Sequence, residues 1–97
     1  MMLYLGRVFA AMYEIALSRK AQKFYAKAND ELISRLDKCF DDLCQDPYKS
    51  PNIKKLKGDL EVSWRYRVGD YRVVYIVDEQ NKNIIVSVIA HRRESYR

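Results

Sequence analysis

The sequence predicts an α+β domain in which a two-helix hairpin packs on a mostly antiparallel sheet of about four strands. Three patterns predict it. Residues 19–45 carry apolar side chains at helical spacing, with one interruption. Residues 62–77 alternate as two strands joined by a tight turn. Residues 84–90 are nearly all apolar and β-branched, as expected of a strand covered on both faces.

The size and charge of the chain limit what it can do. Its 97 residues make one small domain with a modest core. The composition is 48% hydrophobic and 32% charged, which excludes wholesale disorder. Lysine and arginine total 18 against 13 acidic residues, which gives a net charge of +5. A small basic domain favours nucleic acid or another polyanion as its partner.

The first strand is expected at residues 12–17, and we place the start of the functional domain, residues 12–97, at Met12. Residues 1–11 are then an N-terminal extension. The alternative is that they form a real extra element that packs on the domain. They are too short and too interrupted to span a membrane, and they lack the continuous apolar centre of a secretory signal.

The two helices are bounded by capping and breaking residues. Ser18 can cap the first helix, Asn29 and Asp30 supply a break and a new cap, and the second helix ends before Asp46-Pro47. Cys39 and Cys44 fall in the second helix, turned away from each other, so we expect neither a disulfide nor a metal site. We interpret both cysteines as small buried hydrophobes in a reducing cytoplasm.

The predicted hairpin 62–77 carries the most informative pattern. Its two-residue loop, Gly69-Asp70, makes Arg67 the cross-strand partner of Arg72. Two arginines opposite each other on one sheet face repel, at a cost on the order of 0.2–1 kcal/mol. The simplest explanation is an anion between them, and paired arginines most often bind phosphate. The alternative interpretation remains possible, in which the arginines are simply solvated and hinder aggregation at an edge strand of the sheet.

Alternation within the hairpin divides its side chains between two faces. Arg65 shares a face with Arg67, and the opposite face carries Val62, Trp64, Tyr66 and Val68. We interpret Trp64, together with Tyr71 and Tyr75, as core or half-core residues rather than base-stacking platforms. Residues 45–57 predict a loop in which Lys49 is solvated. Three further lysines extend a basic surface beside the hairpin, and these are Lys54, Lys55 and Lys57.

The last strand brings further basic residues to the same place. If the polar turn at 78–83 closes a second hairpin, the end of strand 84–91 lies level with Asp70 and Tyr71. Five side chains from three strands then converge on one edge of the sheet, namely Arg67, Arg72, His91, Arg92 and Arg93.

This cluster lacks the parts of most active sites. The sequence has no Ser/His/Asp set, no glycine-rich phosphate loop and no carboxylate cluster for Mg²⁺, so we expect no metal and no cofactor. Several guanidinium groups with one imidazole and a tyrosine fit phosphoryl transfer on RNA, where the ribose 2′-OH is already the nucleophile. A positive field lowers the pKa of a tyrosine or histidine that must accept a proton.

Three motifs resemble the RelE/ParE superfamily of bacterial toxins. They are Leu-Lys-Gly at 56–58, the run 66–75 (YRVGDYRVVY) and the run 91–96 (HRRESY), following a strand and a helical hairpin. The chain is most similar to the RelE branch, the ribosome-dependent mRNA interferases of toxin–antitoxin modules, over residues 12–97. The resemblance therefore implies a cytoplasmic endoribonuclease with a RelE-like fold.

The resemblance also implies roles for individual residues. Arg72 matches the family's essential arginine, which would hold the scissile phosphate, and Arg65 and Arg67 match two basic residues on the preceding strand. Arg92 matches an arginine that stabilises charge on the leaving group, and Tyr96 matches a tyrosine that stacks on or activates the nucleotide. The family's best-known members have lysines at the first pair, and arginine cannot act as a base. Proton acceptance is then expected from His91 or Tyr96. RNA or ribosome binding is expected from Lys54, Lys55, Lys57 and Arg93.

The implied partners are mRNA, the ribosome and a cognate RelB-like antitoxin that is acidic and partly disordered. No membrane partner is expected. Two alternatives remain at this point. One is a ParE-like toxin of the same fold, which inhibits DNA gyrase and has no nuclease activity. The other is a non-catalytic RNA-binding module, which explains the charge but gives no reason for the C-terminal tyrosine.

Overall fold

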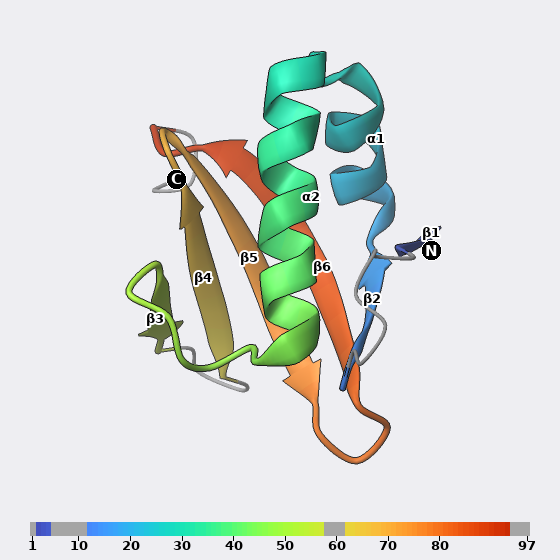
Figure 1. Ribbon diagram of the computed structural model, residues 1–97, viewed down its shortest axis with the longest axis vertical. Helices are drawn as coiled ribbons and strands as arrows, with labels where there is room; N and C mark the ends of the chain where they lie inside the picture. Colours follow the sequence, from blue (N-terminus) through green and yellow to red (C-terminus); the bar gives the residue numbers. More distant parts are fainter. Residues whose placement is uncertain (1, 5–11, 58–61, 94–97) are drawn as a thin grey trace.

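The computed structural model describes residues 2–4, 12–57 and 62–93. Two helices lie on one face of a single six-stranded sheet (Figure 1), which confirms the predicted α+β arrangement. The elements in chain order are β1 (Met2–Tyr4), β2 (Glu14–Leu17), α1 (Arg19–Lys27), α2 (Asp30–Gln45), β3 (Ile53–Leu56), β4 (Ser63–Val68), β5 (Tyr71–Asp78) and β6 (Asn83–His91). We call the sheet face opposite the two helices the open face.

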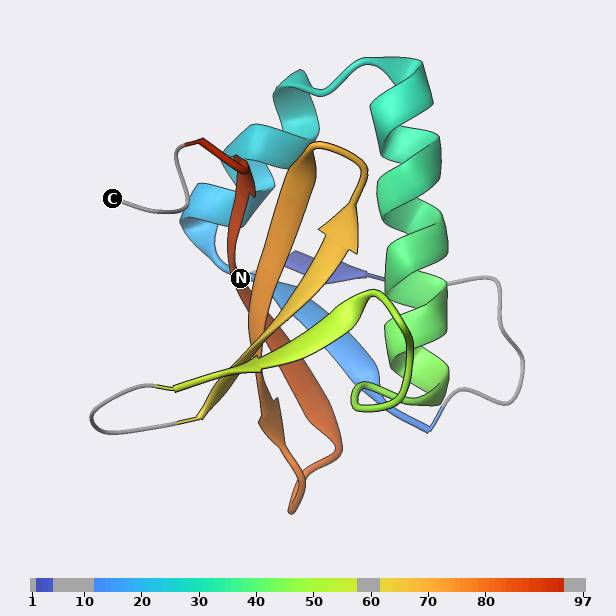
Figure 2. The ribbon, with the colours of Figure 1, turned by 90° about the vertical axis from the view of Figure 1, so that its left-hand side faces the viewer.

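The sheet is larger than predicted. Its strand order is β1-β2-β6-β5-β4-β3, and every neighbouring pair is antiparallel except β2 and β6. The prediction of about four strands missed β1 and β3. Residues 53–56 were expected to be part of a loop but form β3 at the outer edge of the twisted sheet (Figure 2). Exposed lysines suit an edge strand because they hinder pairing with another chain.

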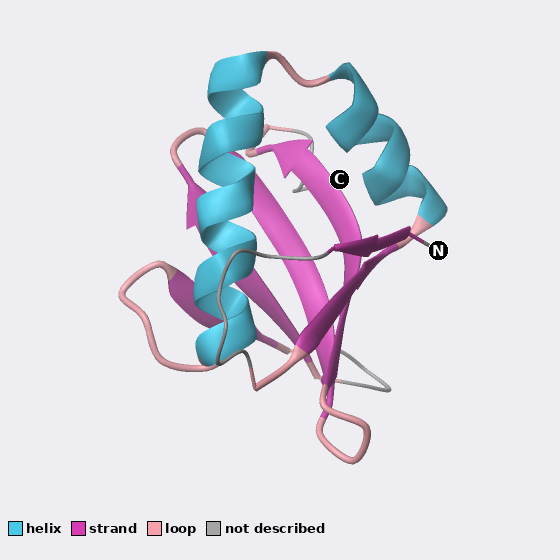
Figure 3. Ribbon diagram, turned by 45° about the vertical axis from the view of Figure 1, so that its right-hand side comes forward, coloured by secondary structure: helices cyan, strands magenta, loops and turns pink. Residues whose placement is uncertain are grey.

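The N-terminal residues contribute the other edge. β1 pairs with β2, with Leu3 opposite Ala16, and lies beside the start of α1 (Figure 3). Met2–Tyr4 is therefore an extra element that packs on the domain. This agrees with the alternative to a separate N-terminal extension that was considered for residues 1–11. Residues 5–11 lie outside the described part of the chain. The domain boundary at Met12 stays a prediction.

The helix boundaries follow the capping residues that predict them. The Ser18 side chain accepts a hydrogen bond from the Ala21 backbone N–H, and Asn29 accepts one from that of Leu32. α2 ends at Gln45, before Pro47. The predicted helical hairpin is thus confirmed. No helix in the described part of the chain is long and apolar enough to cross a membrane.

The core lies between the helices and the sheet. α2 contributes Leu36, Phe40 and Leu43, while β5 contributes Val73 and Tyr75, all of them fully buried. Cys39 and Cys44 are buried and free, as expected.

The placement of Val62 in the first hairpin strand was wrong. β4 begins one residue later, and the Val62 side chain is 48% exposed.

A β-bulge divides β6 into two halves. Val74 pairs with Val88 but Tyr75 pairs with Val86, which leaves Ser87 as the extra residue. An extra residue reverses the faces of everything beyond it in the strand. The helix-facing residues of β6 are therefore Ile84 and Val86 before the bulge, and Ile89 and His91 after it. Ile85 and Val88 lie on the open face and are half-buried, so only one face of this strand is covered by helices.

Candidate functional site

The predicted arginine pair lies at the tip of the β4–β5 hairpin. Arg67 is opposite Arg72, as the two-residue turn predicts. Gly69 has a φ of +58°, a left-handed conformation that suits this turn. Arg67 donates from Nε to the Gly69 carbonyl oxygen at 3.4 Å. The backbone of the turn therefore sets the position of the pair, and like charges remain next to each other across the hairpin.

Alternation places three arginines on the open face. Val73 and Tyr75 face the helices and are fully buried, so Arg72 between Tyr71 and Val73 projects to the other side. Arg65 and Arg67 share that side of β4, where Arg65 donates from Nη1 to the Asn52 carbonyl oxygen at 3.2 Å. We call Arg65, Arg67 and Arg72 the arginine cluster.

The end of β6 lies beside this cluster. The Arg92 backbone N–H donates to the Asp70 carbonyl oxygen at 2.8 Å, which holds the chain after β6 against the hairpin turn. Arg92 and Arg93 are both exposed. The predicted convergence of β4, β5 and β6 at one end of the sheet is therefore found in the backbone. Tyr96 lies outside the described residues, so its predicted role stays a prediction.

His91 reaches the same end of the sheet but the opposite face. It pairs with Tyr71, and the two rings pack edge to face with centroids 5.4 Å apart. Tyr71 in turn packs edge to face on Phe24 of α1, at 5.7 Å. The expectation that His91 joins Arg72 in one cluster is corrected here. The bulge at Ser87 turns His91 toward the helices, and the sheet separates it from the arginine cluster.

The predicted RNA-binding lysines do not share one surface. Lys54 is opposite Arg65 and extends the arginine cluster along the open face. Lys55 is opposite Trp64, and its Nζ lies 5.9 Å from the centre of the Trp64 ring on the other side of the sheet. Lys57 follows β3 and is exposed. Only Lys54 is thus placed to extend the surface that carries Arg65.

The tyrosines on the helix side of the sheet are structural. Burial and a hydrogen bond to Asp42, 2.7 Å from the hydroxyl, raise the pKa of Tyr66 to about 12. Burial also raises the pKa of Tyr75, whose hydroxyl donates to the Pro47 carbonyl oxygen at 2.6 Å. A raised pKa makes deprotonation harder, so neither hydroxyl is suited to accept a proton as a phenolate at neutral pH.

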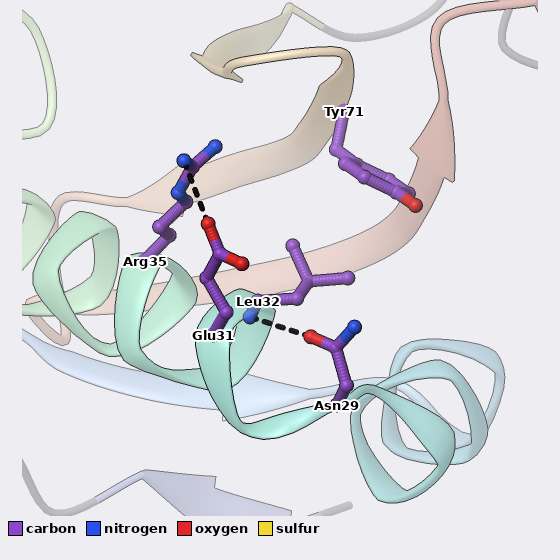
Figure 4. Close-up of a pocket in the computed structure, with 5 residues that line it drawn as sticks. All are labelled: Asn29, Glu31, Leu32, Arg35 and Tyr71. Carbon is purple, nitrogen blue, oxygen red and sulfur yellow. Dashed lines mark hydrogen bonds and ion pairs between the residues drawn. The ribbon is translucent and has the colours of Figure 1, made fainter.

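A further arginine reaches the hairpin tip from α2. Figure 4 shows a pocket lined by Asn29, Glu31, Leu32, Arg35 and Tyr71. Arg35 donates from Nη2 to Glu31 at 3.0 Å, and its Nη1 would lie 3.3 Å from a side-chain carbon placed on Gly69. This contact was not predicted, because helical spacing does not indicate which turn between strands a helix residue contacts. Within the described residues, no group of three or more His, Cys, Asp or Glu side chains is placed to hold a metal ion.

A hydrogen-bonded cluster at the other end of the sheet was also missed. The Glu79 carboxylate accepts from the Tyr13 hydroxyl at 2.9 Å, from the Tyr48 hydroxyl and from Lys82. It joins the start of β2, the α2–β3 loop and the β5–β6 turn. Lys82 first, and then the two tyrosine hydroxyls, lower the pKa of Glu79 from 4.5 to about 2.

This lowered pKa predicts an acid transition. Because the folded pKa of Glu79 lies below 4.5, the cluster stabilises the fold above that pH and is lost as the pH falls through about 2. We expect the ring signals of Tyr13 and Tyr48 in NMR spectra to change over this range. Glu79→Gln should remove the transition. An identical transition in this variant would assign it to another carboxylate.

The fold and site can now be compared with known proteins. A family model described as the ParE toxin of type II toxin–antitoxin systems, parDE, matches residues 15–96. Toxin RelE of Mycobacterium tuberculosis (strain ATCC 25618 / H37Rv) is 30% identical over 86 residues, which cover 88% of this chain and 87% of that toxin. The chain belongs to the RelE/ParE superfamily of toxins. It is thus a toxin of a type II toxin–antitoxin system.

Solved structures of such toxins share its fold. The archaeal RelE–RelB complex from Pyrococcus horikoshii OT3 superposes with a TM-score of 0.74 at 25% identity, over 84% of this toxin and 96% of that chain. The toxin–antitoxin complex RelBE2 from Mycobacterium tuberculosis gives a TM-score of 0.71 at 19% identity, over 86% and 100% of the two chains. The RelE-like architecture predicted from the sequence is therefore confirmed.

Proposed function

We propose that this toxin is a ribosome-dependent endoribonuclease that cleaves mRNA in the cytoplasm by metal-independent attack of a ribose 2′-OH. The observation that carries the proposal is the Arg67–Arg72 pair on the open face. A cross-strand pair of like charges destabilises a free hairpin, and a phosphate between the two guanidinium groups relieves the repulsion. Arg65, two residues before Arg67 on β4, and Lys54, opposite it on β3, continue this positive surface for the flanking nucleotides.

The reaction makes one bond and breaks another. The 2′-oxygen bonds to phosphorus while the bond from phosphorus to the 5′-oxygen breaks, which leaves a 2′,3′-cyclic phosphate and a 5′-hydroxyl. Arg67 and Arg72 neutralise the charge that grows on the phosphoryl oxygens. Arg92 stabilises the departing 5′-oxygen, which takes its proton from solvent water. Arginine does not accept the 2′-OH proton, and His91 lies across the sheet. We therefore assign proton acceptance to Tyr96.

The chemistry is tested with ribosomes that hold a defined mRNA. Purified toxin should cut this mRNA and leave a 2′,3′-cyclic phosphate end. The same mRNA with a 2′-deoxy nucleotide at the cleaved position should stay intact, since it lacks the nucleophile. Cleavage of the deoxy substrate at an unchanged rate would overturn the 2′-OH mechanism. Free mRNA in a parallel reaction shows whether the ribosome is needed.

Inhibition of DNA gyrase is the second candidate, because the matching family model is that of the ParE toxin. A gyrase supercoiling assay with the same protein separates the two candidates. Inhibited supercoiling together with intact mRNA would support the ParE-like function. A non-catalytic RNA-binding module would instead bind RNA, leave it uncut and have no effect on gyrase.

An acidic antitoxin is the expected partner. The toxin has a net charge of +5, and the similar proteins from Pyrococcus horikoshii and Mycobacterium tuberculosis were solved as complexes with RelB-type antitoxins. Co-expression of the toxin with the product of an adjacent gene should restore growth, and the two proteins should co-purify. Association should slow as salt rises, because salt screens the attraction between opposite charges. A salt-independent association rate would contradict recognition by charge.

A further inference from the structure

An aromatic surface with a lysine beside it lies on the helix side of the sheet, away from the arginine cluster. It consists of Tyr48, Lys55 and Trp64, and we call it the Trp64 surface. The Tyr48 and Trp64 rings pack edge to face with centroids 5.1 Å apart, and Lys55 Nζ is 5.9 Å from the Trp64 ring centre. Tyr48 is 36% exposed, and Trp64 is half-buried. The surface thus presents ring area and a positive charge to solvent together.

Both rings are held in place. Trp64 lies within β4, between Lys55 on β3 and Tyr75 on β5. The Tyr48 hydroxyl donates to Glu79, and its backbone N–H donates to Asp46 at 2.9 Å. Rings that are fixed before a ligand arrives lose little conformational freedom on binding. The Trp64 surface is therefore preorganised, although Tyr48 is in a loop.

The charge around the rings indicates what binds there. Lys54 and Lys57 are exposed on the same edge as Lys55. Two acidic groups that contact Tyr48 have other partners as well, since Glu79 also binds Lys82 and the Tyr13 hydroxyl, and Asp46 also accepts from the Lys49 backbone N–H. Aromatic rings beside lysines are the usual platform for single-stranded nucleic acid, in which bases stack on the rings and phosphates pair with the cations.

We propose that the Trp64 surface is a second RNA contact, where one unpaired base stacks on the exposed Tyr48 ring next to Trp64 and Lys55 binds the adjacent phosphate. The inference rests on the proposed function, because the RNA is the substrate mRNA strand. β3 is the edge strand, with Lys54 beside Arg65 on one face and Lys55 beside Trp64 on the other. A single strand that passes around this edge contacts both faces.

The test uses the toxin with Arg72→Ala, so that cleavage does not consume the RNA, and a ten-nucleotide oligoadenylate as the probe. Trp64 is the single tryptophan of the chain, so its fluorescence reports directly on a base that stacks there. We expect the RNA to quench this emission. Tyr48→Ala in this background should weaken binding by about tenfold or more, the effect of losing one stacked base.

Two further variants separate the loss of the Tyr48 ring from other effects of the substitution. Tyr48→Phe keeps the ring and loses only the hydroxyl that binds Glu79, so it should bind like the parent. Lys55→Glu leaves both rings intact and should also weaken binding, which covers the case in which Tyr48→Ala loosens the loop. RNA binding without quenching, or equal affinities of Tyr48→Ala and Tyr48→Phe, would overturn the proposal.

Acidic protein is the competing occupant. Quenching by an oligoglutamate peptide but not by the RNA would assign the surface to such a partner and reject the RNA contact. The outcome is separate from that of the proposed function, because cleavage of ribosome-bound mRNA is measured with unmodified Arg72. Cleavage without quenching rejects only the second contact, and quenching without cleavage rejects only the nuclease.

Discussion

Replacing Arg72 by alanine is expected to reduce cleavage of ribosome-bound mRNA by about 10²–10³-fold or more, the usual effect of removing one donor to a developing oxyanion. Folding should be little affected, because the change also removes the repulsion between Arg72 and Arg67 across the hairpin. Primer extension on the mRNA measures the first quantity and urea unfolding the second. Toxicity should be lost in parallel.

Two further variants serve as controls for this prediction. Arg19→Ala removes an exposed arginine at the start of α1, on the helix side, and should cleave normally. Arg72→Lys keeps the charge without the two-pronged guanidinium and should retain only part of the activity. If Arg72→Ala arrests growth at equal expression, the arginine cluster is not a phosphate clamp, and gyrase inhibition becomes the better explanation.

The largest effect on stability is expected from Phe40→Ala. Phe40 is fully buried at the centre of α2 and stacks on Tyr25 with ring centroids 6.1 Å apart. Loss of a buried phenylalanine ring leaves a cavity and typically costs about 3–5 kcal/mol. A domain of this size has a free energy of unfolding of only about 5–15 kcal/mol. The urea midpoint of the variant, measured with Arg72→Ala to permit expression, should therefore fall sharply.

Phe24→Ala is the matched comparison. Phe24 is only half-buried, at the margin of the core, where its ring meets Tyr71. It should lose clearly less stability than Phe40→Ala. Equal losses at the two positions would mean that the core extends over the Phe24–Tyr71–His91 contacts, and that His91 has a larger structural role than its half-buried position suggests.

The face reached by a side chain proved harder to predict than its position along a strand. The Arg67–Arg72 pair was predictable because a two-residue turn admits one register, and this register places both side chains on the same face. His91 was placed at the right end of the sheet, in one cluster with Arg72, but it lies on the opposite face. A single extra residue at Ser87 reverses the alternation, and neither side of this bulge differs enough in composition to reveal it.

Contacts between distant segments account for the other differences. Residues 53–56 carry two lysines and follow two prolines, so their pattern is that of a loop, yet pairing with β4 makes them a strand. Tyr48 packs on Trp64, and Arg35 approaches Gly69, only because the fold brings the α2–β3 loop and α2 against the β4–β5 hairpin. These neighbours are 16 and 34 positions apart in the sequence, and no periodicity links them.

The helix starts and the register of the β4–β5 hairpin were thus determined by the sequence alone. Caps at Ser18 and Asn29 start the helices, and the Gly69-Asp70 turn sets the arginine register, because each depends on residues only a few positions apart. The tertiary structure decided which groups share a surface. It separated His91 from Arg72 and Lys55 from Lys54, because the bulge and the edge strand assign faces through hydrogen bonds between strands that are remote along the chain.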